Sequence, residues 1–492
     1  MQLSSVLSIN FLTFFVFIFS FFSSSSIFAQ EEVVKFDHSP VNGIVSHDTI
    51  YTDYIVLKEI IIRGNNITRN RILLREIDCK TGDTISSKIL EEKLLWIKNR
   101  LFNTMLFLSV EVNLSGKDSV SKTLLITTRE RFYFIPFPSG GLADRNFNEW
   151  WVDRNHALNR IDYGLNLKVK NMWGLNHTMK LKATTGFNKK LEASYAIPYI
   201  DKKSKTGLII NALLVYNRQV ACQTYEHKLD YIETPGYGRK RFNLGFFLTR
   251  RNKFYTLHQL GPYFQYTSIA DTIARLNPNY FLNGATFQRI YGAKYTYTKD
   301  RRDFISYPLK GFFFKTELDF QHLESVKTID VEILRLEYSQ YVPLGKNFFF
   351  AAGARGKFST PSIQPYNSQR GLGYNKEWVS GYELYVIDGQ AYGLIKTNLK
   401  WQILSIKPTV KIIPVQKFKT VPLRVYLKIY SDWGYIVDNT YNPNNNFLSN
   451  HLLTGGGVGI DIVTYYDVVA RIECSINGLG QTGVFLNLKA GL

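Results

Sequence analysis

Cysteine is scarce in this sequence of 492 residues. The three cysteines, Cys79, Cys222 and Cys474, lie far apart, with no CxxC spacing and no Cys/His cluster. An odd and scattered set of thiols excludes a disulfide framework and a structural zinc site. We therefore expect isolated structural thiols, and we predict no metal and no other cofactor.

Catalytic motifs are also missing. The eight histidines lack the spacing of metal ligands, and the sequence contains no nucleophile elbow and no HExxH motif. Residues 478–483 spell GxGxxG, but a dinucleotide-binding motif must open a helix. The next residues, 484–488, alternate like a strand, so we interpret the motif as a hairpin loop. The sequence predicts that the protein is not an enzyme.

Long apolar runs are confined to the N-terminus. The run from Phe11 to Phe22 is followed by serines and then by Ala29, which is the pattern of a secretory signal peptide. An uncleaved membrane anchor would need about 20 apolar residues, and this run is shorter. We expect a cleaved signal peptide over residues 1–29 and a polar leader over 30–53.

Aromatic residues, by contrast, are abundant. They make up 15% of the chain, yet the mean hydropathy is only −0.14. The aromatic residues are therefore diluted by polar ones, as in strands with one polar face. The formal net charge of +20 suits an anionic partner, either nucleic acid or lipid headgroups. The export signal favours lipid headgroups, and we predict no nucleic-acid partner.

Residues 54–131 have the pattern of a small α+β domain. A β-branched run precedes two helical stretches, and the second stretch has an apolar stripe at helical spacing. The stripe comprises Leu90, Leu94, Ile97 and Leu101. Two strands follow, over 106–114 and 123–129, so the order of elements is β-α-α-β-β.

This domain resembles a polypeptide-transport-associated (POTRA) domain. The resemblance rests on the order of elements, on the segment Ile62-Arg63-Gly64-Asn65-Asn66-Ile67-Thr68, on Gly82-Asp83 and on Arg100-Leu101-Phe102-Asn103. In that family the strand after the long helix is an exposed edge, which an extended client can join by β-augmentation. The resemblance implies a client-docking edge at Leu106, Leu108, Val110, Val112 and Leu114. Alternatively, this strand only completes the local core.

Residues 132–492 consist of alternating segments of about ten residues. In 311–321, apolar side chains face one way and charged side chains face the other. A soluble sandwich also alternates, but strands of this length joined by short turns and long loops in alternation are typical of a membrane barrel. We predict a transmembrane antiparallel β-barrel of about 16 strands.

The longest connection of this region spans residues 359–390. It is polar and rich in glycine, and it has no helical period. Such a connection is uncommon in a compact domain unless it is functional or disordered, and its aromatic residues argue against disorder. We predict an ordered loop that folds into the barrel.

Three motifs extend the resemblance to nearly the whole mature chain. Their residues are Arg302, Asp303, Pro308 and Gly311 in a turn, Val379-Ser380-Gly381-Tyr382 in the long loop, and Tyr430-Ser431-Asp432-Trp433-Gly434 in a strand. These are similar to motifs of the BamA/TamA outer-membrane assembly and translocation superfamily. The chain departs from that pattern at Ser380, where the family has Arg, and at Leu492, where many outer-membrane proteins end in an aromatic residue.

The resemblance implies that the protein inserts, assembles or translocates other polypeptides at the bacterial outer membrane, with its POTRA domain in the periplasm. It implies unfolded outer-membrane or secreted polypeptides, outer-membrane lipids and accessory subunits as partners. Two alternatives stay open, a dedicated two-partner-type secretion pore and a passive diffusion channel.

We also predict a barrel seam between the first and the last strand. Prolines lack an N–H and belong on strand edges, and the first strand contains two of them. The predicted seam residues are Pro136, Pro138, Phe485 and Leu492.

The last hypothesis concerns the inner wall around Gly434. A period of two places both Asp432 and Lys400 on the inward face. Because Ser380 replaces the Arg of the family, we expect Lys400 to be the partner of Asp432. We expect Tyr382 and Arg370 to help hold the loop.

Overall fold

The computed structural model describes residues 54–488, except 117, 119, 144–149, 152–153, 202, 204, 375–376, 407–421, 441–442 and 465–467. The predicted signal peptide, the polar leader and Leu492 lie outside the described residues. No helix in this described part of the chain is long and apolar enough to cross a membrane.

The N-terminal domain is built on a four-stranded sheet. Its elements are β1 (Tyr54–Arg63), α2 (Asn70–Glu76), β2 (Thr84–Ser86), α3 (Leu90–Asn103), β3 (Phe107–Ser115) and β4 (Ser121–Glu130). The strand order is β2-β1-β4-β3, so β3 is an edge strand. The predicted stripe of α3 packs on the core, because Ile97 and Leu101 are buried and Leu90 and Leu94 contact the same cluster. The sequence did not indicate the short β2.

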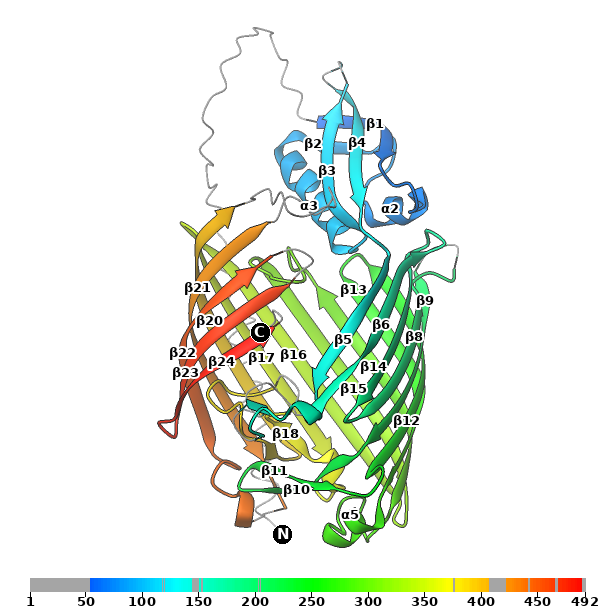
Figure 1. Ribbon diagram of the computed structural model, residues 1–492. Helices are drawn as coiled ribbons and strands as arrows, with labels where there is room; N and C mark the ends of the chain where they lie inside the picture. Colours follow the sequence, from blue (N-terminus) through cyan, green and yellow to red (C-terminus); the bar gives the residue numbers. More distant parts are fainter. Residues whose placement is uncertain are drawn as a thin grey trace. The chain divides into compact units, whose positions relative to one another are not determined.

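The rest of the chain forms one large antiparallel sheet, which has 16 strands among the described residues. They are β5 (Phe134–Leu142), β6 (Ile161–Met172), β7 (His177–Gly186), β8 (Lys189–Ile197), β9 (Thr206–Asn217), β12 (Arg239–Lys253), β13 (Thr256–Ile269), β14 (Phe287–Asp300), β15 (Gly311–Glu324), β16 (Ile329–Gly345), β17 (Phe348–Thr360), β20 (Ala391–Ile406), β21 (Leu423–Val437), β22 (Leu452–Val463), β23 (Val469–Asn477) and β24 (Thr482–Leu488). The sheet curls into a barrel (Figure 1), which confirms the predicted fold class.

Side chains of the barrel strands alternate between two environments. On β15, Phe320 is 51% exposed on the outer face, whereas its neighbour Asp319 is buried on the inner face. On β21, Ile429 is exposed and Lys428 is buried in the same way. An apolar outer face with a polar interior is the pattern of a barrel that spans a membrane.

The two ends of the sheet are β5 and β24. Within the described residues, β5 pairs with β6 and β24 pairs with β23, and no pairing joins β5 to β24. Both strands border the front of the barrel in Figure 1. We call this junction the seam.

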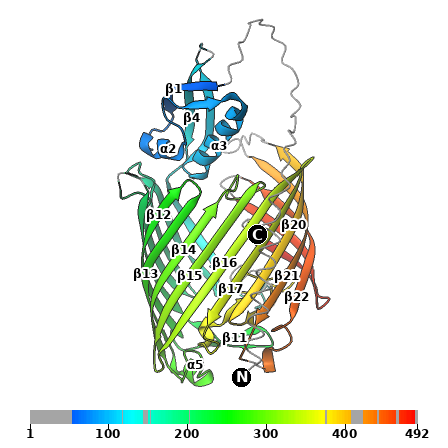
Figure 2. The same cartoon turned by 180° about the vertical axis from the view of Figure 1, so that it is seen from behind.

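Several connections carry structure of their own. The hairpin β10 (Gln219–Tyr225) and β11 (Lys228–Glu233) lies with α5 (Asp271–Leu276) at one end of the barrel (Figures 1 and 2). The inward loop, residues 361–390, contains the short pair β18 (Arg370–Leu372) and β19 (Ile387–Asp388).

Candidate functional site

The inward loop packs an apolar face against the inner wall of β20, β21 and β22. The buried cluster comprises Leu372, Val379, Tyr382, Ile387, Tyr392, Leu394, Ile436, Leu448 and Leu453. Burial of apolar area is the main force that holds such a segment. The loop is therefore fixed to one side of the barrel.

A polar contact adds specificity to this docking. One carboxylate oxygen of Asp432 on β21 accepts a hydrogen bond from the Ser380 amide at 3.1 Å and another from the Ser380 hydroxyl. The same oxygen pairs with the Lys396 ammonium on β20 at 2.9 Å. Asp432 is buried, and these three donors compensate its charge.

The predicted partner of Asp432 is wrong. Lys396 lies opposite Asp432 in the β20–β21 register, whereas Lys400 lies opposite Lys428. Lys400 is four residues further along β20, which is about 13 Å. Its ammonium lies 4.4 Å from the ring centre of Tyr307, so it occupies a different part of the inner wall.

Glycines on the wall make room for the loop. A Cβ at Gly455 on β22 would lie 1.9 Å from the Ser380 carbonyl oxygen, and one at Gly434 on β21 would lie 2.5 Å from Val379 Cγ2. Gly381 has φ = +87°, which a residue with a side chain adopts only with strain. The loop motif and the wall therefore fit each other backbone to backbone.

The loop also reaches the last hairpin of the barrel. The Asn477 side-chain amide donates to the Gly381 carbonyl at 2.8 Å. Tyr382 is buried, and Tyr385 exchanges hydrogen bonds with Gln481 in the β23–β24 turn. Arg370, the other residue expected to hold the loop, contacts the Tyr374 ring at 5.4 Å.

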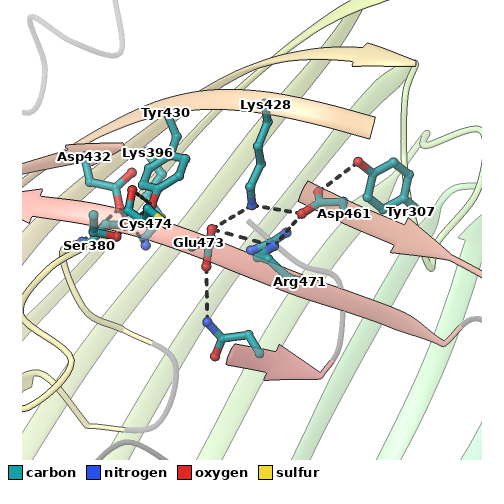
Figure 3. Close-up of polar contacts among 12 residues, drawn as sticks. Tyr307, Ser380, Lys396, Lys428, Tyr430, Asp432, Asp461, Arg471, Glu473 and Cys474 are labelled. Carbon is teal, nitrogen blue, oxygen red and sulfur yellow. Dashed lines mark hydrogen bonds and ion pairs between the residues drawn. The ribbon is translucent and has the colours of Figure 1, made fainter. Parts of the chain in front are cut away.

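Four charged residues form what we call the wall network, Lys428, Asp461, Arg471 and Glu473 (Figure 3). The Lys428 ammonium lies 3.0 Å from Asp461 and 2.6 Å from Glu473. Arg471 Nε lies 3.1 Å from Asp461. Two cations and two anions balance within a buried cluster, which is the condition under which buried charges are tolerated.

The wall network has two outer contacts. The Tyr307 hydroxyl donates to Asp461 at 2.9 Å from the β14–β15 turn (Figure 3). The Asn487 side chain on β24 donates to Glu473 at 3.2 Å. The network thus connects a turn of the middle strands to a strand of the seam.

The predicted turn motif lies in the same β14–β15 turn. Arg302 forms an ion pair with Asp300 at 2.6 Å, and Asp303 accepts from the Leu309 amide at 3.0 Å. Burial raises the pKa of Asp303, and backbone N–H groups oppose the rise. Pro308 is buried, and Gly311 has φ = +99°. These residues shape the turn that delivers Tyr307.

The predicted seam residues lie on both end strands. Pro136 and Pro138 are exposed residues of β5. Phe485 on β24 is buried on the inner face. The neighbouring Val484 and Leu486 are exposed on the outer face.

The predicted client-docking residues lie on the edge strand β3 or directly before it, but their side chains face the domain. Leu106 and Val110 are buried, and Val112 and Leu114 pack against the same core; Leu108 is half-buried. The exposed side chains of β3 include Glu111 and Asn113. A client at this edge would therefore meet backbone groups rather than the listed apolar side chains.

One histidine connects three loops at the barrel end. His227, in the β10–β11 turn, is completely buried. Its Nε2 accepts from the Leu448 amide at 3.1 Å, and its carbonyl accepts from the Val386 amide at 2.8 Å. Burial lowers the pKa of His227 to about 4. The neutral ring therefore ties the hairpin to the inward loop and to the β21–β22 loop.

Sequence reasoning missed Lys396, Gly455 and the wall network. Lys396 lies on the same predicted inward face as Lys400, so periodicity alone could not separate them. The run Gly455-Gly456-Gly457 inside a strand was a usable signal, because glycine in a strand often marks a close backbone approach. Among the described residues, no group of three His, Cys, Asp or Glu is placed to hold a metal ion.

The 16-stranded barrel that follows a β-α-α-β-β domain defines the class of this protein. A family model described as "Omp85 superfamily domain" matches residues 171–466, and one described as "Surface antigen variable number repeat", a POTRA model, matches residues 55–131. The chain belongs to the Omp85 superfamily.

Solved structures share the fold at low sequence identity. The chain is similar to BamA from Haemophilus ducreyi lacking POTRA domains 1-3, with 13% identity and a TM-score of 0.51 over 88% of this chain and 84% of that one. It is also similar to CdiB from Escherichia coli, with 13% identity and a TM-score of 0.53 over 88% of this chain and 76% of that one. A search of curated proteins gave no match.

Proposed function

We propose that this protein inserts or translocates other polypeptides at the bacterial outer membrane through its seam. The observation that carries the proposal is that β5 and β24 end the sheet without a pairing between them in the described residues. Unpaired backbone groups on two edges can be matched by a client strand. The prolines of β5 weaken that edge further, because they offer no N–H.

The N-terminal domain supports a role in capturing clients from the periplasm. Its edge strand β3 presents a free row of backbone groups, which an extended client can join as a further strand. Photo-crosslinkers at the exposed positions Glu111 and Asn113 should capture unfolded barrel precursors. Capture only at the outer face of α3 would contradict docking at this edge.

The lipid partners proposed for this barrel are anionic headgroups. Lys240 and Arg250 are exposed near the two ends of β12 and share its outer face with Phe246 and Leu248. Cations that flank an apolar band lie at headgroup level in a membrane. This arrangement supports attraction to anionic lipids.

A locked seam tests the proposal. We would introduce one cysteine in β5 and one at the facing position of β24, in a Cys474→Ser background, because Cys474 is exposed while Cys79 and Cys222 are buried. After depletion of the wild-type copy, the oxidised variant should fail to restore the outer-membrane proteome, and reduction should rescue it. A cysteine pair across β13 and β14 is the matched control.

The outcome of the depletion distinguishes the alternatives. Broad loss of barrel proteins indicates assembly, whereas loss of one exported protein indicates a dedicated secretion pore. Altered solute uptake alone would indicate a passive channel, as would full activity of the locked barrel. Attachment of the inward loop to Asp432 and Asn477 supports a transport machine over an open channel.

A further inference from the structure

A polar cavity of about 210 Å³ lies beneath the β10–β11 hairpin. Four segments far apart in the sequence line it, namely the ends of β9 and β12, the β13–β14 loop and the inward loop. They contribute Asn217, Arg239, Tyr280, Tyr366, Arg370 and Tyr374, among others. The cavity therefore lies where the inward loop meets the wall of the N-terminal strands.

Arginines dominate the electrostatics of this cavity. Arg239 and Arg370 line it, and Arg241 lies two residues after Arg239 on the same face of β12. Both neighbours repel the Arg241 guanidinium, whose Nε is buried without a hydrogen-bond partner. Like charges in a poorly solvated site raise the free energy of the folded protein unless an anion compensates them.

The described residues supply no such anion at the cavity. None of the three arginines forms an ion pair with a described residue, and no Asp or Glu is among the residues that line the cavity. Arg239 donates to the Asn217 side-chain oxygen at 3.0 and 3.2 Å and to the Tyr280 hydroxyl at 3.5 Å. The nearby Asp388 accepts from the Tyr374 hydroxyl at 2.5 Å.

We propose that this cavity binds the phosphate group of a phosphorylated sugar. Guanidinium groups bind phosphate through paired, charge-assisted hydrogen bonds. The rest of the lining fits a sugar, because tyrosine rings offer flat apolar faces and amide side chains such as Asn188, Asn217 and Asn367 pair with hydroxyl groups. The ligand is either the headgroup of an outer-leaflet glycolipid or a soluble sugar phosphate.

The bound phosphate would also attach the inward loop to the barrel wall. Arg370 belongs to β18 of the loop, whereas Arg239 and Arg241 belong to β12. One phosphate between them would convert a repulsive contact into an attractive one. The inward loop is held by Asp432 on one side of the barrel, and the ligand would hold it on the other.

Isothermal titration of the full chain in detergent, at fixed ionic strength, tests the site. The probes are glucose 6-phosphate, inorganic phosphate and glucose. We expect one saturable site for glucose 6-phosphate, weaker binding of phosphate and none of glucose. Arg370→Gln and Arg241→Gln should each weaken binding of glucose 6-phosphate at least tenfold. Arg250→Gln is the control, because Arg250 lies on the outer face of the same strand.

Two results would overturn the proposal. One is the absence of saturable binding by any phosphate probe. The other is unchanged affinity in Arg370→Gln, a variant expected to fold because this side chain is exposed to the lumen. Equal binding of glucose and glucose 6-phosphate would equally exclude a phosphate site.

The source of the ligand needs a second arm. Glucose 6-phosphate is titrated into the protein in nanodiscs with and without lipopolysaccharide. Weaker apparent binding in the presence of lipopolysaccharide assigns the site to a lipid headgroup. Identical binding in both nanodiscs assigns it to a soluble sugar phosphate. Failure of the seam experiment would leave both results unaffected, because this site lies in the β10–β11 end of the barrel.

Discussion

The inner wall of the barrel differs between its two halves. From β14 to β23, cations and anions are interleaved. Glu317 lies 3.3 Å from Lys294 and 2.8 Å from Arg335, and Arg355 lies 2.8 Å from Glu337. On β6 and β7 the cations face each other instead, because Lys168 lies directly opposite Lys180. The arginines of β12 continue this basic surface.

The difference indicates two roles for one sheet. Ion-paired side chains that bridge adjacent strands fix their neighbours, and the inward loop docks on that half at Asp432. The basic half instead offers positive potential to whatever enters the lumen. We infer that the C-terminal half anchors the loop and that the N-terminal half receives ligands or clients.

The largest expected effect comes from breaking the wall network. Asp461→Asn leaves Lys428 and Arg471 with one acid between them. Removing one partner from a buried charged cluster costs about 3–5 kcal/mol, so we expect a large drop in the heat resistance of the folded barrel on gels. Asp330→Asn is the control, because that side chain is 80% exposed. Equal melting of the two variants would mean that the network contributes little.

The next effect comes from the wall glycine that contacts the loop. In Gly455→Val the new side chain would collide with the Ser380 carbonyl. Overpacking of this kind costs about 1–3 kcal/mol, and the loop should leave the wall. Trypsin cleavage after Arg370 measures the release. Gly141→Val should have no such effect, because no atom lies within 4 Å of its added Cβ.

A smaller effect separates Lys396 from Lys400. Lys396→Met removes a charge-assisted hydrogen bond from buried Asp432, which should cost about 2 kcal/mol. Lys400 forms no ion pair with a described residue, so Lys400→Met should cost less. Thermal unfolding in detergent compares them directly. A larger loss in Lys400→Met would restore the partner predicted from the sequence.

This pair of residues shows how far sequence reasoning reaches. Local periodicity was sufficient for the barrel, since Phe320 and Asp319 alternate as expected. The choice between Lys396 and Lys400 depends on the register of β20 against β21, which shifts between Gln402 and Leu404. Register is set by turns and bulges rather than by the alternation itself.

The arginine cavity and the Tyr307 contact were beyond the sequence for a different reason. Tyr307 and Asp461 are separated by 154 residues, and they meet only because the barrel curves and the β14–β15 turn folds inward. Curvature of a sheet leaves no periodic signal in any single strand. The inward loop was predictable because its length and aromatic content are local properties.

A pH change should loosen the link between the two halves at His227. The folded protein keeps this ring neutral, with a pKa of about 4 against 6.5 when free. Below pH 6.5 the open form takes up a proton and the closed form does not, so the closed form loses stability as the pH falls toward 4.

We expect a loss on the order of 1 kcal/mol one pH unit below 6.5. Hydrogen exchange of the Leu448 amide reports it, because that amide donates to Nε2 of His227. Asp438 acts on the same ring and opposes the shift. His227→Gln, which keeps an acceptor but cannot titrate there, should remove the pH dependence. If the wild-type exchange were flat between pH 7 and 5, His227 would not be the link.

The smallest expected effect tests the basic half itself. Lys180 lies opposite Lys168, and like charges on facing residues of neighbouring strands are destabilising. Lys180→Gln should therefore stabilise the barrel by roughly 0.3 kcal/mol in low salt, and salt should abolish the gain by screening. Lys315→Gln, in the ion-paired half, removes a contact of 3.5 Å to Glu317 and should have the opposite sign. Changes of equal sign in the two variants would erase the distinction between the halves.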